Sequence, residues 1–247
     1  IKKWQLLWHR SDAPAVDLQE ADFLSVGNRA FRKSRRSMEE IRLPEGLSAI
    51  KSEAFRDCRR LFSVRLPEDS DVGLGTGAFR DCVRLREITP FEHLSSIGER
   101  AFSGCTMLSQ IPFGTGLRRI GAYAFRDCAS LRSVSLPAHL ESIGKGAFLN
   151  CTELERVEIE DGITHLAPAM LRGCISLGEL RFPSTLTVLE EDILRDCSAL
   201  SSIHLPGSVQ RIERNALRGC RRLREARMDL GVSMIGAGAF RDCPELR

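Results

Sequence analysis

Apolar residues recur along most of the chain at intervals of 23 or 24 residues. Each copy contains a leucine, a branched apolar residue three positions later and another apolar residue two positions after that, as in Leu131, Val134 and Leu136. Such alternation is typical of a short strand that buries one face. Pro137 then ends the strand, because proline cannot donate a hydrogen bond to a neighbouring strand. Each copy is thus predicted to contain one short, half-buried strand.

The rest of each copy also keeps its apolar positions in a constant register. Leu140 and Ile143 form a second apolar pair, Gly144 turns the chain, and Ala147 and Phe148 begin the next copy. A period in the twenties indicates a solenoid, in which equivalent side chains of successive copies stack into one elongated core. At about 4.8 Å per copy, about nine copies span roughly 45 Å. We therefore predict one continuous array.

All nine cysteines occupy one slot of the repeat. They are Cys58, Cys82, Cys105, Cys128, Cys151, Cys174, Cys197, Cys220 and Cys243. No two lie closer than 23 residues and their number is odd, so neither a metal site nor a disulfide framework is expected. We predict a structural column of buried thiols that face backbone carbonyls, with no metal and no cofactor. Unpaired thiols favour a reducing compartment, the cytoplasm or an organelle interior, although burial would protect them elsewhere.

The two ends of the chain depart from the repeat. Residues 1–29 are predicted to form an N-terminal cap and a degenerate half-rung, because Trp4 and Trp8 alternate as in a strand that covers an open end. Residues 30–247 are predicted to form the array, which stops in the middle of a copy without a polar cap. We expect either that the natural chain continues or that a protein partner covers this end.

The pattern A-F-x-x-C-x-x-L-x-x-V-x-L-P-x-x-L-x-x-I-G resembles the BspA-like class of leucine-rich repeats, over about nine-tenths of the chain. The departures are mild. Ser34 stands in the cysteine slot, and other apolar pairs replace Ala-Phe at Met170-Leu171, Ile193-Leu194 and Ala216-Leu217. The resemblance implies a right-handed β-solenoid of about nine rungs, with a parallel sheet on one face, short strands or turns on the other and little helix.

Composition and motifs narrow the function classes. The net charge is only +3, and aromatic residues are not interleaved with basic clusters, which disfavours nucleic acid as a partner. No run of 18 apolar residues occurs, so no transmembrane segment is expected and any membrane association would run through partners. The five histidines are scattered over different copies, and no nucleophile motif or phosphate-binding loop is present. We predict that the protein is not an enzyme.

Two charged columns follow the Ala-Phe pair. Arginine fills the next slot at Arg32, Arg56, Arg80, Arg126, Arg172, Arg195, Arg218 and Arg241. Aspartate fills the slot after it at Asp57, Asp81, Asp127, Asp196 and Asp242. Neighbouring columns of opposite charge are expected to neutralise each other along a solvated edge.

Outward positions of the first strand are the candidate partner-binding face, because solenoids commonly bind through such a surface. The candidate residues are Arg42, Arg65, Glu87, Arg156, Glu158, Glu179, Arg181, His204, Glu225 and Arg227. This face has few aromatic residues, so its affinity would depend on complementary charge and shape. Phe62 and Tyr123 are candidate exposed aromatics in slots that hold polar residues in other copies.

The regular array and the lack of catalytic motifs favour a non-catalytic scaffold for protein–protein interactions, a module or accessory subunit that docks onto partner proteins in a larger assembly. The alternative is a cell-surface or secreted adhesin or binding module, a role that the family resemblance makes plausible.

Overall fold

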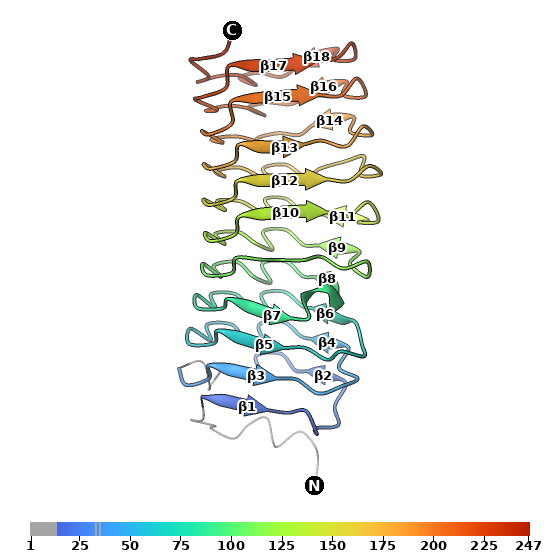
Figure 1. Ribbon diagram of the computed structural model, residues 1–247, viewed down its shortest axis with the longest axis vertical. Helices are drawn as coiled ribbons and strands as arrows, with labels where there is room; N and C mark the ends of the chain where they lie inside the picture. The colour runs from blue at the N-terminus through green and yellow to red at the C-terminus, as the bar shows by residue number, and fades with distance from the viewer. Residues whose placement is uncertain (1–13, 33, 35) are drawn as a thin grey trace.

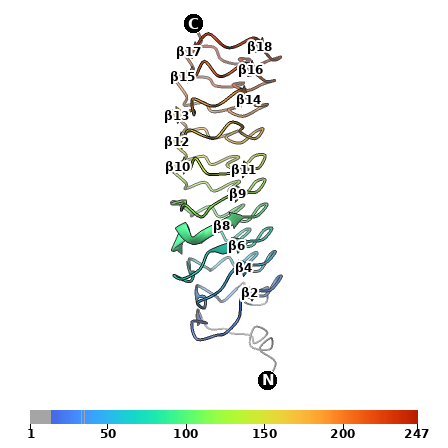
Figure 2. The same cartoon turned by 90° about the vertical axis from the view of Figure 1, so that its right-hand side faces the viewer.

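The chain folds into a right-handed β-solenoid of about ten turns, called rungs below (Figure 1). The computed structural model describes residues 14–32, 34 and 36–247, so Trp4 and Trp8 lie outside the described residues. In Figure 1 the nearer strands run from left to right and the return strands run back as the chain climbs, which makes the coil right-handed. Figure 2 shows the two sets of strands on opposite sides of a stack with little curvature. The predicted fold class is confirmed.

One face of the solenoid consists of parallel strands, each contributed by one rung. These front strands are β1 (Ala15–Asp17), β3 (Glu40–Arg42), β5 (Ser63–Arg65), β7 (Glu87–Thr89), β10 (Ser133–Leu136), β12 (Arg156–Ile159), β13 (Glu179–Arg181), β15 (Ser202–Leu205) and β17 (Glu225–Met228). Equivalent residues face each other, as Val134 faces Val157 and Val157 faces Leu180. The sequence period therefore sets the strand register.

The front face is divided into three ladders, β1-β3-β5-β7, β10-β12-β13 and β15-β17. Residues 110–112, between β7 and β10, form no strand although they occupy the strand slot. Pro112 has no N–H group with which to extend the ladder, and this accounts for the first interruption.

Strands of two to four residues return the chain on the opposite face. They are β2 (Ser25–Val26), β4 (Ala49–Ile50), β6 (Val72–Leu74), β8 (Leu94–Ile97), β9 (Arg119–Ile120), β11 (Ser142–Ile143), β14 (Val188–Leu189), β16 (Arg211–Ile212) and β18 (Met234–Ile235). Among the described residues the one helical segment is the 3-10 turn η2 (Phe91–His93). The expectation of little helix is therefore confirmed for the described part of the chain.

The described part of the expected N-terminal cap already follows the repeat. β1 pairs with β3, and β2 pairs with β4, with every residue in register. Residues 14–29 thus contribute both strands of a rung, which adds one rung to the nine expected.

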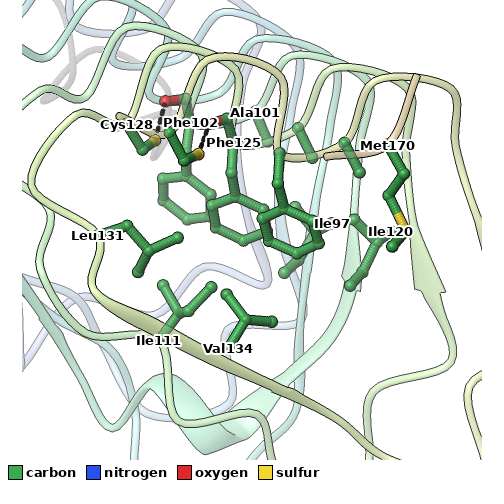
Figure 3. Packing of buried hydrophobic residues seen from close by; sticks show 14 of the residues in the cluster. Ile97, Ala101, Phe102, Ile111, Ile120, Phe125, Cys128, Leu131, Val134 and Met170 are labelled. Carbon is green, nitrogen blue, oxygen red and sulfur yellow. Dashed lines mark hydrogen bonds between the residues drawn. The ribbon is translucent and has the colours of Figure 1, made fainter. Parts of the chain in front are cut away.

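A column of phenylalanine rings runs through the core (Figure 3). Successive rings stack with centroids 4.6 to 5.5 Å apart and interplanar angles of 2° to 12°. The column is formed by Phe31, Phe55, Phe79, Phe102, Phe125 and Phe148. Leu171, Leu194 and Leu217 fill the same slot in later rungs and are fully buried. The slot therefore accepts any bulky apolar side chain that continues the core.

The predicted column of buried thiols lies beside the phenylalanines. Cys58 to Cys220 are buried, and Cys243 is partly buried. Each thiol lies within hydrogen-bonding distance of a backbone carbonyl of the preceding rung, as in the 3.2 Å contact from Cys128 Sγ to the carbonyl oxygen of Phe102 (Figure 3). The cysteines therefore bond neighbouring rungs together, as well as filling space between them.

Candidate functional site

The outward side chains of the front strands form a continuous polar surface. In β12 the pattern is regular, since Arg156 and Glu158 are exposed while Val157 and Ile159 are buried. Nine of the ten candidate residues on this face are exposed, and Arg42 is half-buried. The strand alternation expected from the sequence thus places these side chains on one face.

Four charged residues form two ion pairs across β12 and β13. Arg156 Nε lies 2.7 Å from Glu179 Oε2, and Arg181 lies 3.6 Å from Glu158. The hydrogen bond to Glu179 raises the pKa of Arg156, and the same bond lowers the pKa of Glu179. In one pair the arginine is on β12 and in the other it is on β13, so positive and negative charges alternate around the four residues. They border a shallow hollow of about 520 Å³ that extends to His204.

Further along the stack, the front face carries a histidine–aspartate contact and one more ion pair. His204 Nε2 lies 3.2 Å from Asp229 Oδ1, and Arg227 Nε lies 2.7 Å from Glu225 Oε1. The hydrogen bond to Glu225 raises the pKa of Arg227. Exposed ion pairs of this kind add little stability, about 0–1 kcal/mol each, so they are free to exchange one partner for another.

The N-terminal part of the front face has a different charge pattern. Arg42 donates to Gln19 at 3.1 Å and lies 3.8 Å from Asp17. Arg65 faces Arg42 in register, and neither Arg65 nor Glu87 forms an ion pair within the described residues. A hollow of about 350 Å³ is lined by Asp17, Arg42, Arg65 and Glu87 among others.

The arginine and aspartate columns pair as expected along the edge of the stack. Arg126 Nε lies 3.0 Å from Asp127 Oδ2, and Arg80 Nε lies 3.3 Å from Asp81 Oδ2. The backbone gives a further reason for the aspartates, because Asp127 and its equivalents adopt a positive φ near 60°. Aspartate, asparagine and glycine tolerate this left-handed conformation best. The signal was present in the sequence, since Asn150 and Gly104 fill the same slot.

The two candidate aromatics are half-buried, which corrects the expectation that they are exposed. Tyr123 lies under the guanidinium of Arg100, 5.2 Å from the ring centroid, and its ring covers the backbone at Gly146. Phe62 lines a hollow between rungs and is described further below. A long side chain from a neighbouring rung thus partly covers each of these two aromatic residues, although equivalent positions in some other rungs are exposed.

The described residues contain no group of histidine, cysteine or acidic side chains placed to hold a metal ion. Burial raises the pKa of the thiols from Cys82 to Cys243, to about 12 for Cys174 and Cys220, which makes them poor nucleophiles and metal ligands at neutral pH. No helix in the same part of the chain is both long and apolar enough to cross a membrane.

A family model described as the BspA type leucine rich repeat region, with six copies, matches residues 24–136 and 118–247. The chain belongs to the BspA-type leucine-rich repeat family. Its repeating columns of cysteine, leucine and phenylalanine are thus those of a BspA-type solenoid. No curated protein matches the chain at a significant level.

Solved structures that match this BspA-type chain with a TM-score of at least 0.50 share its fold. One from Bacteroides ovatus ATCC 8483 is 20% identical, with a TM-score of 0.50, covering 97% of this chain and 87% of its own. The pneumococcal vaccine antigen PcpA is 15% identical, with a TM-score of 0.51, covering 94% and 76%. A leucine rich cell surface protein from Faecalibacterium prausnitzii A2-165 is 18% identical, with a TM-score of 0.49, covering 95% and 86%.

Proposed function

We propose that this chain is a non-catalytic protein-binding module and that the front face is its docking surface. The observation that supports this most directly is the row of exposed charged side chains carried by short strands in strict register. The buried columns beneath hold each strand in place, so the backbone that carries these charges needs no further ordering when a partner binds. A protein with a complementary charge pattern would meet a largely preorganised surface.

The charge pattern suggests how such a partner would be recognised. Arg156, Glu158, Glu179 and Arg181 alternate in sign, so a uniformly charged polymer would meet attraction and repulsion together. A folded protein with both signs of charge can match this arrangement. Because aromatic anchors are absent from these four positions, affinity would come from charge and shape over an extended area.

Crosslinking on the two faces tests the docking surface. Benzoylphenylalanine placed at Ser135, which is exposed on β10, is expected to crosslink to partner proteins in native extract, with the products identified by mass spectrometry. The matched control is Ser142, which is exposed in the same rung but lies on the return strand β11. Equal products from both positions would count against the front face.

A pair of charge reversals then tests the chemistry. Arg181→Glu on the front face removes the 3.6 Å pair with Glu158, and Arg119→Glu on the return face removes the 3.5 Å pair with Glu141. The two variants change charge equally and disrupt similar exposed pairs. We expect Arg181→Glu alone to reduce the crosslinking from Ser135, by about tenfold if the charge lies within the interface.

The proposal includes membership of a larger assembly, with one partner at the last rung. Met228, Met234 and Ile235 are all exposed there, with between 39% and 54% of their surface accessible. A partner that covers these side chains would slow amide hydrogen exchange in β17 and β18 when the assembly forms. Unchanged exchange in these two strands in the isolated complex would exclude this contact.

A cell-surface or secreted binding module is a second candidate. Buried thiols with raised pKa values resist oxidation, so the cysteine column is also compatible with an oxidising environment. A tagged protein that is digested by protease added to intact cells would support this candidate. A tagged protein that is protected until the cells are lysed would support an internal assembly.

A further inference from the structure

A hollow at the edge of the stack, separate from the front face, combines apolar and cationic side chains. It measures about 380 Å³ and is lined by Phe62, Arg84, Arg86 and Met107. These residues come from three successive rungs, just before the chain enters β5 and β7 and the strand slot that follows (Figure 1). Phe62 and Arg86 occupy the same slot in neighbouring rungs, where the Arg86 N–H donates to the carbonyl of Phe62 at 3.0 Å.

The two arginines in this hollow lack the carboxylate partners that most arginines of the solenoid have. Arg84 and Arg86 are exposed and form no ion pair within the described residues. By contrast, Arg60 of the rung below pairs with Glu39, and Arg132 of a later rung lies 3.8 Å from Glu153. The hollows of the front face include carboxylates in their walls, whereas this one includes none. Its positive charge is therefore available to a ligand.

Apolar side chains lie on both sides of the two arginines. Phe62 is half-buried on one side, and Met107 is 40% exposed on the other. Since neighbouring rungs are about 4.8 Å apart, these apolar contacts are separated by roughly 10 Å. A short extended peptide of three or four residues spans this distance.

We propose that this hollow binds an acidic peptide segment of a partner protein, in which one or two carboxylates lie between bulky apolar side chains. The carboxylates would pair with Arg84 and Arg86, since guanidinium groups bind carboxylates in a two-pronged geometry. The apolar side chains would cover Phe62 and Met107 and exclude water from the ion pairs. Nucleic acid does not suit this site, because a strand needs a row of free cationic side chains along its phosphates. The neighbouring arginines along this edge, Arg60 and Arg132, are already paired with glutamates.

The test uses the full chain and a fluorescein-labelled decapeptide with two central glutamates flanked by leucines, measured by fluorescence anisotropy. Two control peptides replace the glutamates by glutamine or the leucines by serine. We expect the first peptide to bind and each control peptide to bind at least about tenfold more weakly. No binding of the first peptide, or equal binding of the serine peptide, would overturn the proposal.

Variants of the chain locate the binding site. Arg84→Glu with Arg86→Glu is expected to weaken binding by more than about tenfold, because it reverses both charges that meet the glutamates. The matched control is Arg221→Glu with Arg222→Glu, which lies on the same edge and has no ion pair within the described residues. Equal loss in both double variants would mean that the peptide is attracted only by general positive charge, and the proposal would be wrong.

The apolar contacts are tested by Phe62→Ser and Met107→Ser. Serine fills the same slots at Ser109 and Ser130 in other rungs, so both variants are expected to fold, as far-UV circular dichroism would verify. Each should weaken peptide binding several-fold, and unchanged binding would contradict the proposal.

Poly-uridine that competes as well as the unlabelled peptide would also overturn the proposal in favour of a polyanion site. Arg181→Glu should leave the affinity unchanged, so this proposal and the front-face proposal can fail separately.

Discussion

Raising the pH above about 9 is expected to destabilise the solenoid steeply through its column of buried thiols. Seven thiols, from Cys82 to Cys220, have their pKa raised from 9.0, mainly because burial disfavours the charged thiolate. The folded chain therefore keeps protons that the unfolded chain releases above pH 9. The resulting stability is fully present below the unfolded pKa and is lost as the pH rises toward about 12, the folded value for Cys174.

The size of the effect follows from the number of thiols. One pH unit above the unfolded pKa, each buried thiol reduces the free energy of unfolding by about 1.4 kcal/mol, and seven together reduce it by roughly 10 kcal/mol. This is comparable with the whole stability of a typical domain, about 5–15 kcal/mol. We therefore expect cooperative alkaline unfolding near pH 10. Far-UV circular dichroism between pH 7 and 11, with a phosphine reductant present, would measure it.

A variant with fewer thiols provides the control. Replacing Cys82, Cys128, Cys174 and Cys220 by alanine leaves three of the seven thiols, and each deletion also leaves a small cavity. The comparison is therefore made on the change of unfolding free energy with pH within each protein, from urea titrations. Because the pKa of Cys243 is also raised, the slope above pH 9 should fall to about half in the variant. Equal slopes, or a wild-type chain that stays folded at pH 11, would refute the reasoning.

Two further substitutions test the packing inside the rungs, both measured by urea denaturation. Phe125→Ala should lower the free energy of unfolding by about 3–5 kcal/mol, because the buried ring stacks between Phe102 and Phe148 with centroids 5.3 Å apart on each side. Phe125→Leu should lower it by under about 2 kcal/mol, because leucine fills this position in other rungs. Equal costs would mean that the aromatic stack itself is required. Gly121→Ala should lower the free energy of unfolding by more than about 2 kcal/mol, because the added Cβ would lie 2.4 Å from a backbone nitrogen of the preceding rung. Gly178→Ala should change it by under about 1 kcal/mol, because a Cβ at this position would have no atom within 4 Å. Similar losses in the two alanine variants would contradict the close approach at Gly121.

The fold could be predicted from the sequence because a solenoid gives equivalent residues equivalent surroundings. Most copies contain an equivalent of Cys128, Leu131 and Val134 at the same spacing, and this spacing predicts which side chains lie above one another. The register of the front strands, the buried thiols and the shortage of helix all follow from that one period. Departures from regularity were harder to predict. Pro112 was visible in a strand slot, but its effect on the ladder depended on which N–H groups bond to the next rung.

The candidate surface was predicted less completely. The strand period placed Arg156 and Glu179 on one face, yet their ion pair depends on side-chain conformations that sequence spacing does not fix. The aspartate column was read as a matter of charge, although its left-handed backbone is an equally strong reason for Asp127. Phe62 was predicted to be exposed because its slot is polar in other copies, whereas its actual surroundings depend on the long side chains of the next two rungs.

The difference between the fully buried and the partly covered positions of the repeat explains how such a solenoid can vary its partners without losing its fold. Phe125 and Cys128 are fully buried, so changes there alter packing in both neighbouring rungs. The slots of Phe62 and Met107 are only partly covered, and their equivalents in other rungs include arginine, serine and glutamate. Substitution in these slots should change stability little while it changes the charge and shape of the edge. Binding specificity in this chain is therefore expected to lie in those slots where one rung differs from the next, and the unpaired arginines beside Phe62 and Met107 are one such place.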